Sequence, residues 1–340
     1  MKIKSINISN FKSFENLEIN LGDFNVLIGS NASGKTNFTQ IFRFLKDIGQ
    51  EGLKNAISMQ GGEFFRNINL NSDIFSVNIK HSFYYNKEIK CGYYFKLRFK
   101  TKNDFLIEEV IINDSNKENS IDNIETPALE NFSDEIAIYD FNPKLPQQAI
   151  PLAGKRELEE DGKNLPIVLK NILENEEDKK KFLNILTTLL PNVKDLNVEP
   201  FASNYLVLKL QEKYSSDYLP AFLMSDGTIT IIELIIALFF EEKPVIIIEE
   251  PERNIHPALF SALIGLMKEA SKEKQIIITT HNPEIIKHAY LEDSNSLLLI
   301  SRDKKGFSQI SRPADNERLK VFLQNDIGID QLFIDDLLGI

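Results

Sequence analysis

The sequence predicts an α/β protein with a mostly parallel sheet, an antiparallel β-subdomain and a small helical insertion. In the last third, apolar and polar patterns alternate between helix and strand, which is typical of a parallel sheet built from βαβ units. Earlier in the chain, three consecutive stretches with strand-like patterns indicate a β-meander. Between these regions, residues 164–190 have the pattern of two short helices separated by the charge run 174–181.

The expected elements can be given in chain order. We expect strands at 2–9, 14–20 and 23–28, a helix with apolar residues at Phe38, Ile41, Phe42 and Leu45, and a solvated loop at 112–126. The remaining expected strands and helices are the meander strands 75–85, 91–101 and 104–113, strand 135–140, a strand pair near 195–213, helix 227–240, strand 244–248, helix 257–272, and strands 275–279 and 296–300.

Length and composition indicate one composite globular domain. Its 340 residues are 42% hydrophobic and 26% charged, and we divide them into an N-terminal lobe (1–150), the helical insertion (151–195) and a C-terminal lobe (196–340). The net charge of −11 argues against general attraction to nucleic acid or anionic membranes, although a local basic patch remains compatible with it.

The chain shows no sign of secretion or membrane insertion. The single cysteine, Cys91, cannot form an internal disulfide, which suits a reducing compartment. The most apolar stretch, 229–240, is too short to cross a bilayer and contains Glu233, so we expect it to be a buried helix. We therefore expect a cytoplasmic protein without a membrane partner.

The segment after strand 23–28 matches the phosphate-binding pattern G-x-x-x-x-G-K-[ST] in full. Its residues are Gly29, Ser30, Asn31, Ala32, Ser33, Gly34, Lys35 and Thr36, followed by Asn37 at the start of the expected helix. Backbone N–H groups of such a loop surround phosphate oxygens. Lys35 would reach the β- and γ-phosphates, and the Thr36 hydroxyl would bind Mg²⁺. The alternative is a glycine-rich turn with a chance Lys-Thr pair.

Two carboxylates end the apolar strand that begins at Val245. Glu249 and Glu250 would point in opposite directions on a pleated strand, so they can have different functions. One can bind Mg²⁺, and the other can orient and deprotonate an attacking water. The alternative is a strand that merely ends in solvated acids.

Two further segments occur in the order expected of one nucleotide site. His281 follows the apolar strand 275–279, and strand ends of an open α/β sheet face one crevice, so His281 is a candidate for a hydrogen bond to the γ-phosphate. Ser225 and Gly227 precede the buried helix, where they could bind an anion or serve as an ordinary helix cap.

Taken together, these motifs resemble the ATP-binding-cassette (ABC) superfamily of P-loop NTPases, in its RecF/SMC-like branch. Within it the sequence is most similar to small stand-alone ATPases with AAA-type labels, related to the ATPase part of the overcoming-lysogenization-defect (OLD) proteins. The residues that carry the resemblance are 10–14, 29–36, 225–228, 249–252, 255–257 and 280–284.

The resemblance implies ATP and Mg²⁺ as cofactors and a specific role for each motif. Residues 29–36 would be the Walker A loop, Glu249 the acid on the metal side, Glu250 the catalytic glutamate and His281 the switch histidine. Lys12 would approach the nucleotide from the N-terminal hairpin. For the Q-loop glutamine, which also binds the metal, Gln147 and Gln148 are both candidates.

The resemblance also implies a head-to-tail homodimer closed by ATP. Ser225 and Gly227 would form the signature motif that contacts the γ-phosphate held by the opposite subunit, and residues 254–257 would form the D-loop. Asp226 stands where the family usually has glycine, and Glu249 replaces the usual aspartate. No segment matches the coiled-coil arms of larger relatives, so DNA tethering by arms is not implied.

The sequence leaves the biological output open. ATP hydrolysis could drive a switch in DNA maintenance, DNA repair or a defence-type complex. Alternatively, the chain could be a nucleotide-gated module that hydrolyses little and recruits DNA or an effector protein. Lys96, Arg98, Lys100 and Lys102 alternate along one strand, which indicates either a solvated face or a contact to a phosphate backbone.

Overall fold

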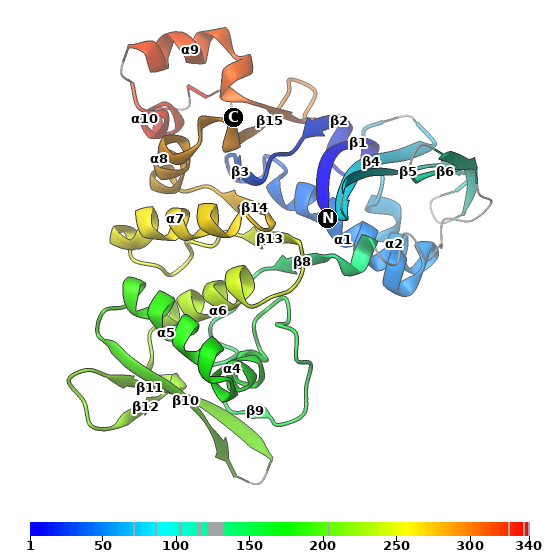
Figure 1. Cartoon of the computed structure of the whole chain (residues 1–340). Helices are drawn as coiled ribbons and strands as arrows, with labels where there is room; N and C mark the ends of the chain where they lie inside the picture. The colour runs from blue at the N-terminus through cyan, green and yellow to red at the C-terminus, as the bar shows by residue number, and fades with distance from the viewer. Residues whose placement is uncertain are drawn as a thin grey trace. The chain divides into compact units, whose positions relative to one another are not determined.

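The computed structural model, shown in Figure 1, describes residues 1–70, 72–85, 87–101, 104–114, 117–120, 132–202, 204–325, 327–335 and 337–338. The chain forms two units. Unit 1 comprises Met1–Ala137, Lys243–Ile247 and Ser271–Ile340, and unit 2 comprises Ile138–Glu242 and Ile248–Ala270. The three-lobe division made from the sequence stays a prediction.

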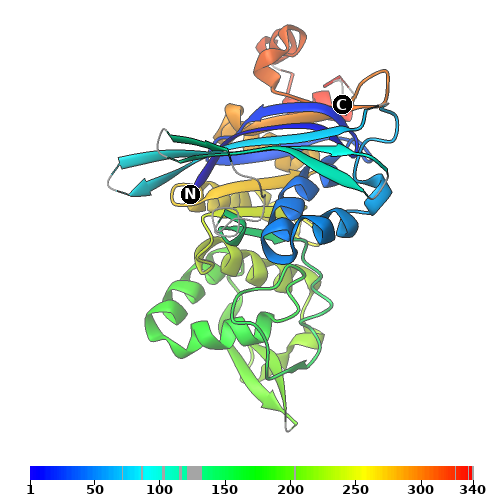
Figure 2. The same ribbon diagram turned by 90° about the vertical axis from the view of Figure 1, so that its right-hand side faces the viewer.

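The predicted antiparallel β-subdomain is a six-stranded sheet. Its strands, in spatial order, are β2 (Phe14–Asn20), β1 (Lys2–Phe11), β4 (Ile74–Tyr85), β5 (Lys87–Phe99), β6 (Phe105–Asp114) and β7 (Lys117–Ser120). A tight hairpin joins β1 and β2, with Phe11 opposite Phe14. Figure 2 shows this sheet nearly edge-on, with α1 (Lys35–Glu51) and α2 (Leu53–Met59) on one side of it.

A cluster of buried phenylalanines joins α1 to this sheet. Phe44 of α1 lies between Phe11 of β1 and two strand residues, Phe75 and Phe95, and its ring centroid is 4.7 Å from that of Phe65. All five rings are at most 2% exposed. Complete burial of such rings stabilises a fold by about 1.5–3 kcal/mol each, so this cluster fixes α1, and with it the loop that precedes α1.

The predicted parallel sheet is a second six-stranded sheet. Its strands, in spatial order, are β16 (Ser308–Ser311), β15 (Leu297–Arg302), β3 (Phe24–Ile28), β14 (Gln275–Thr280), β13 (Val245–Glu249) and β8 (Ile136–Tyr139). β3 is parallel to both β14 and β15, whereas β16 is antiparallel to β15. β3 and β14 are buried at every residue, which is typical of strands covered on both faces.

The remaining elements of unit 1 are short. They are η1 (Gly62–Phe64), α8 (Pro283–Glu292), η4 (Ser294–Ser296), η5 (Pro313–Asp315), α9 (Glu317–Gln324) and α10 (Ile329–Ile334).

Unit 2 contains the predicted helical insertion and a small sheet. Its elements are β9 (Ile150–Pro151), α4 (Leu165–Glu174), α5 (Glu176–Leu189), β10 (Val193–Phe201), β11 (Tyr205–Glu212), β12 (Tyr218–Pro220), η2 (Ala221–Leu223), α6 (Asp226–Phe239), η3 (Pro257–Leu259) and α7 (Phe260–Ala270). β11 is the central strand and pairs with β10, β12 and β9. α6 is buried at every residue from 229 to 238, which confirms the buried helix predicted there.

Two local predictions were wrong. Residues 112–126 are not all loop, because β6 continues to Asp114 and β7 pairs with it along 117–120; a terminal strand pairs through its backbone, so its polar side chains concealed it. The charge run does not separate the two helices either. Asn175 alone lies between them, and its side chain caps α5 by accepting from the N–H groups of Glu177 and Asp178.

Among the described residues, no helix combines the length and the apolar character needed to cross a membrane.

Candidate nucleotide site

The phosphate loop lies between β3 and α1, as its sequence predicted. β3 ends at Ile28, and α1 begins at Lys35 with Gly34 as its N-cap. Gly34 has a φ of 119° and makes no side-chain cap, and a Cβ there would lie 2.3 Å from Ser308 Oγ. Since no side chain caps this helix start, its N–H groups are available to an anion, and the helix dipole favours one there.

A serine pair braces the loop from outside the motif. Ser308 Oγ on β16 donates to Ser33 O at 2.6 Å and lies 2.8 Å from Ser13 Oγ. Asn37 Nδ2 in turn donates to Ser13 Oγ at 2.8 Å. These bonds connect the N-terminal hairpin, the loop, α1 and β16. The predicted contact of Asn37 with nucleotide stays a prediction.

Lys35 lies across its own loop. Its Nζ donates to the carbonyl oxygens of Gly29 at 2.7 Å and Ser30 at 2.9 Å. The ammonium group is therefore held against the backbone of the loop that precedes it, and its predicted contact with phosphate stays a prediction. Arg302 also contacts the loop, because its Nε donates a hydrogen bond to Ala32 O at 3.0 Å. Ala32 has a φ of 62°.

Lys12 is at the turn of the N-terminal hairpin. Its φ is 47°, its backbone N–H donates to Phe65 O at 3.0 Å, and its ammonium lies 5.8 Å from the centroid of the Phe11 ring. Burial lowers the pKa of Lys12 below its usual value. An anion beside this ammonium would offset that cost, which supports the predicted approach to nucleotide without testing it.

His281 leaves the parallel sheet at the same edge as the phosphate loop. Thr280 of β14 is paired with Ile28 of β3 in parallel register, so His281 and Gly29 are the next residues on neighbouring strands. His281 is exposed. The structure thus places this histidine at the sheet edge that the sequence predicted, and its bond to a phosphate stays a prediction.

In unit 2, the signature residues form the start of α6. Ser225 is exposed and caps the helix, because its Oγ accepts from Thr228 N at 3.1 Å. Gly227 lies against the predicted D-loop, and a Cβ at this position would be 2.5 Å from Asn254 O. A side chain there would displace the backbone of residues 254–255.

Asp226, which departs from the family pattern, is held by the segment that contains the Q-loop candidates. Its Oδ1 accepts from Lys144 Nζ at 2.7 Å and from Gln147 Nε2 at 2.8 Å. The hydrogen bond from Lys144 is the main cause that lowers the pKa of Asp226, and Gln147 adds to it. Gln148, the predicted metal ligand, is exposed.

The glutamate pair ends β13 as predicted. Glu249 is the last residue of the strand, and Glu250 follows with a φ of 45°, in the left-handed region that side chains rarely adopt. The side chain of Glu250 accepts hydrogen bonds from Arg253, which also contacts Asp140 after β8. Asn254 has a φ of 67°.

Several of these residues were not selected from the sequence. Ser13 lies inside a segment that carries the family resemblance, and Arg253 directly follows one. Their contacts depend on partners far along the chain, Ser308 and Asp140. Arg302, which contacts the phosphate loop, lies outside every motif. The only signal in the sequence was the position of Ser13 and Arg253 next to motif residues.

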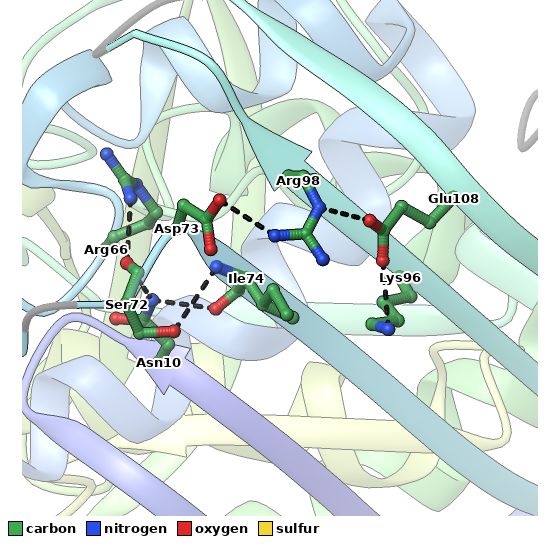
Figure 3. A network of polar contacts seen from close by, with 8 residues as sticks. All are labelled: Asn10, Arg66, Ser72, Asp73, Ile74, Lys96, Arg98 and Glu108. Carbon is green, nitrogen blue, oxygen red and sulfur yellow. Dashed lines mark hydrogen bonds and ion pairs between the residues drawn. The ribbon is translucent and has the colours of Figure 1, made fainter.

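The basic strand face is largely neutralised by acids. Figure 3 shows Lys96 and Arg98 of β5 both contacting Glu108 of β6, with Arg98 also contacting Asp73. The Lys96–Glu108 and Arg98–Asp73 distances are both 2.9 Å. This pairing favours the solvated-face interpretation over a phosphate-backbone contact. Lys102 lies outside the described residues.

Two family models match the sequence. The model described as "AAA domain, putative AbiEii toxin, Type IV TA system" matches residues 94–287, which is more than half of the chain, and the model described as "AAA ATPase domain" matches residues 1–163.

Among curated proteins, the chain is similar to Endonuclease GajA of Bacillus cereus (strain VD045). The two are 51% identical over 47 residues, which cover 14% of this chain and 8% of that protein. The chain therefore spans less than a tenth of the length of this relative.

Among solved structures, the fold is similar to that of SMC heads. An SMC head bound to the C-terminal winged-helix domain of ScpA has a TM-score of 0.60 and 16% identity, with coverage of 92% of this chain and 97% of that one. The SMC head domain from Thermotoga maritima has a TM-score of 0.55 and 15% identity, with 92% and 99% coverage. These likenesses confirm the predicted ABC-type ATPase head fold.

Proposed function

Because the chain belongs to the family of AAA domains whose model covers residues 94–287, and is an ATPase, we propose that it works as a homodimer that ATP closes. In this proposal each ATP is bound on the phosphate loop of one subunit and contacted by the signature residues of the other. Hydrolysis requires Mg²⁺ and reopens the dimer.

The phosphate loop is the observation that carries the proposal. α1 begins without a side-chain cap directly after the loop, and Lys35 already lies across the loop carbonyls. A helix start of this kind binds phosphate through its N–H groups and dipole, and the lysine adds a full positive charge. The braces from Ser308 and Arg302 hold the loop in shape before any ligand arrives, which lowers the ordering cost of binding.

The chemistry of the proposed reaction needs positioned oxygens rather than a covalent intermediate. Thr36 and Glu249 offer the hard oxygen ligands that Mg²⁺ prefers, and the exposed amide of Gln148 is a third candidate. When bound, Mg²⁺ neutralises charge that develops on the phosphate oxygens. Glu250 would orient the attacking water and accept its proton, while His281 would donate to the γ-phosphate.

The signature residues support the dimer part of the proposal. Ser225 is exposed at the uncovered start of α6, so a second subunit can reach it. Asp226 would repel a γ-phosphate, but Lys144 and Gln147 bind its carboxylate and reduce that repulsion. The exposed apolar residues Phe222 and Leu223 directly precede this segment, which is consistent with a surface that becomes covered.

The biological role that we propose is a switch in DNA metabolism or defence. The support is the family description and the segment shared with a protein named an endonuclease. Since Lys96 and Arg98 are paired with acids, we do not assign DNA contact to that strand. DNA or a separate effector protein would act on the closed dimer.

The test combines Glu250→Gln with Ser225→Arg. Glu250→Gln keeps the shape of the side chain but cannot accept a proton, so ATP should bind and stay intact. This variant should be a monomer without nucleotide and a dimer with Mg²⁺-ATP in gel filtration with light scattering. Adding Ser225→Arg should abolish the dimer, because a bulky side chain stands at the contact, while ATP still binds.

Controls separate the dimer from the chemistry. Ser216→Arg places the same bulk on another exposed serine of unit 2 and should leave the ATP-dependent dimer intact. A Glu250→Gln protein that hydrolyses ATP at the wild-type rate would refute the assigned base. If the measured mass is the same with and without nucleotide, the ATP-dependent dimer is refuted, but the assignment of the phosphate loop is unaffected.

A further inference from the structure

Arg253 connects two carboxylates beside the predicted catalytic glutamate. Its Nε and one terminal nitrogen donate to the same oxygen, Oε2 of Glu250, at 3.3 and 3.1 Å. The other terminal nitrogen donates to Oδ1 of Asp140 at 3.1 Å. Arg253 is 113 residues from Asp140 in the chain, so the guanidinium joins the segment after β13 to the end of β8 within unit 2.

The backbone from Glu250 to Ile255 is folded tightly enough to hold this geometry. Arg253 N donates to Glu250 O at 2.9 Å, and Ile255 N donates to Glu252 O at 3.0 Å, which gives two successive turns. Glu250 itself has a φ of 45°. Such a conformation costs about 1–2 kcal/mol for an L-residue and persists only where its surroundings fix it. The guanidinium provides part of that fixation through the side chain.

The contacts have a definite electrostatic direction. Burial alone would lower the pKa of Arg253, but its hydrogen bonds and its proximity to Glu250 and Asp140 raise the value above normal. The guanidinium therefore stays charged wherever the protein is folded. Both of its donors to Glu250 contact the same oxygen, Oε2, so the guanidinium holds that edge of the carboxylate.

We propose that Arg253 is a positioning residue for ATP hydrolysis, which orients the Glu250 carboxylate and is itself anchored by Asp140. This inference rests on the proposed function, in which Glu250 accepts the proton of the attacking water. A general base must lie within hydrogen-bond reach of that proton, and small displacements of a reacting group reduce rates strongly. A guanidinium suits this task because its planar donors are preorganised.

The primary variant is Arg253→Ala, measured by steady-state phosphate release at limiting and saturating ATP. The expected result is a kcat lower by about 10-fold or more. KM for ATP should change less than about twofold, because Arg253 contacts Glu250 and Asp140, which are not proposed to bind phosphate. A purely structural defect would change KM or the folded fraction together with kcat.

Further variants keep the test decisive. Arg253→Lys should restore part of kcat, because an ammonium keeps the positive charge but lacks the planar donors that fix the direction of each bond. Asp140→Ala should lower kcat in the same direction, and Asp140→Ala with Arg253→Ala should be no worse than Arg253→Ala alone, because the anchor acts only through the guanidinium. Arg156→Ala removes an exposed arginine of the same unit and should change nothing. Calorimetric ATP binding reports that each variant is folded. If Arg253→Ala is not folded, Arg253→Lys carries the same test of kcat against KM.

Failure of this inference differs from failure of the proposed function. If Glu250→Gln keeps the wild-type rate, the proposed function fails first. If Glu250→Gln is inactive while Arg253→Ala keeps the wild-type kcat, the positioning role is wrong. A faster Arg253→Ala enzyme would also overturn it, because the guanidinium would then restrain the base instead of orienting it.

Discussion

Replacing Glu233 by glutamine is expected to stabilise the protein increasingly as the pH rises. Glu233 is completely buried in the middle of α6, and neither carboxylate oxygen has a hydrogen-bond partner among the described residues. It lies against Gly162, where a Cβ would be 2.1 Å from Oε1 and where φ is 75°. Burial, and to a lesser degree the charge of Asp161, raises the pKa of Glu233 well above its usual value.

The sign and size of the effect follow from proton linkage. Above the ordinary pKa of 4.5, the unfolded chain releases the Glu233 proton while the folded protein retains it. The folded state then holds more protons, so the free energy of unfolding falls by about 1.4 kcal/mol per pH unit until the folded pKa is reached. In melting temperature this is roughly 2 °C per pH unit for a chain of this length. Glutamine has no proton to release and removes this slope.

The assay is thermal unfolding followed by circular dichroism between pH 4.5 and 8.5. The difference between Glu233→Gln and wild type should be smallest at the acid end and widen toward neutral pH. Burying the glutamine amide has a cost of its own, but that cost does not change with pH. Glu242→Gln, at an exposed position, is the control. Parallel melting curves for wild type and Glu233→Gln would refute this account of the buried carboxyl group.

Two other substitutions test the loop and the signature. Lys35→Ala should weaken ATP binding by about 100-fold or more in calorimetry while the fold survives, because it removes the full charge against the phosphates. Lys54→Ala is the control. An unchanged ATP affinity of Lys35→Ala would refute the assignment of the phosphate loop. Gly227→Ala should lower ATP hydrolysis by about 10-fold or more with ATP binding unchanged, since its Cβ would lie 2.5 Å from Asn254 O. The control is Gly265→Ala in α7, where a Cβ meets nothing within 4 Å and the substitution should stabilise the protein by about 0.5–1 kcal/mol. Equal activity of Gly227→Ala and wild type would show that the close approach of Gly227 to Asn254 is not functional.

The parts of the site that could be predicted from the sequence are those encoded locally. The phosphate loop, the glutamate pair and the residue after β14 each follow an apolar strand within a few positions, so periodicity and motif together located them. The sheet class followed from the same alternation. The pairing of Thr280 with Ile28 then placed His281 beside Gly29, as parallel strands require.

The parts that could not be predicted depend on partners distant in the chain. Ser308 is 295 residues from Ser13, and Arg253 is 113 residues from Asp140, so no local pattern marks them. β7 was missed for a different reason. It pairs with β6 at the end of a sheet through backbone register, and composition does not report backbone pairing.

The position of β3 has a consequence for synthesis of the protein. This strand ends at Ile28, yet its neighbours in the sheet are β14 and β15, which begin at Gln275 and Leu297. On the ribosome, both edges of this buried strand therefore stay unpaired until more than 240 further residues have been made. Contacts of such high sequence separation form slowly and leave aggregation-prone edges exposed. The sheet that positions the phosphate loop is thus completed only after β15 has been made, and chaperones have a long interval in which to bind the nascent chain.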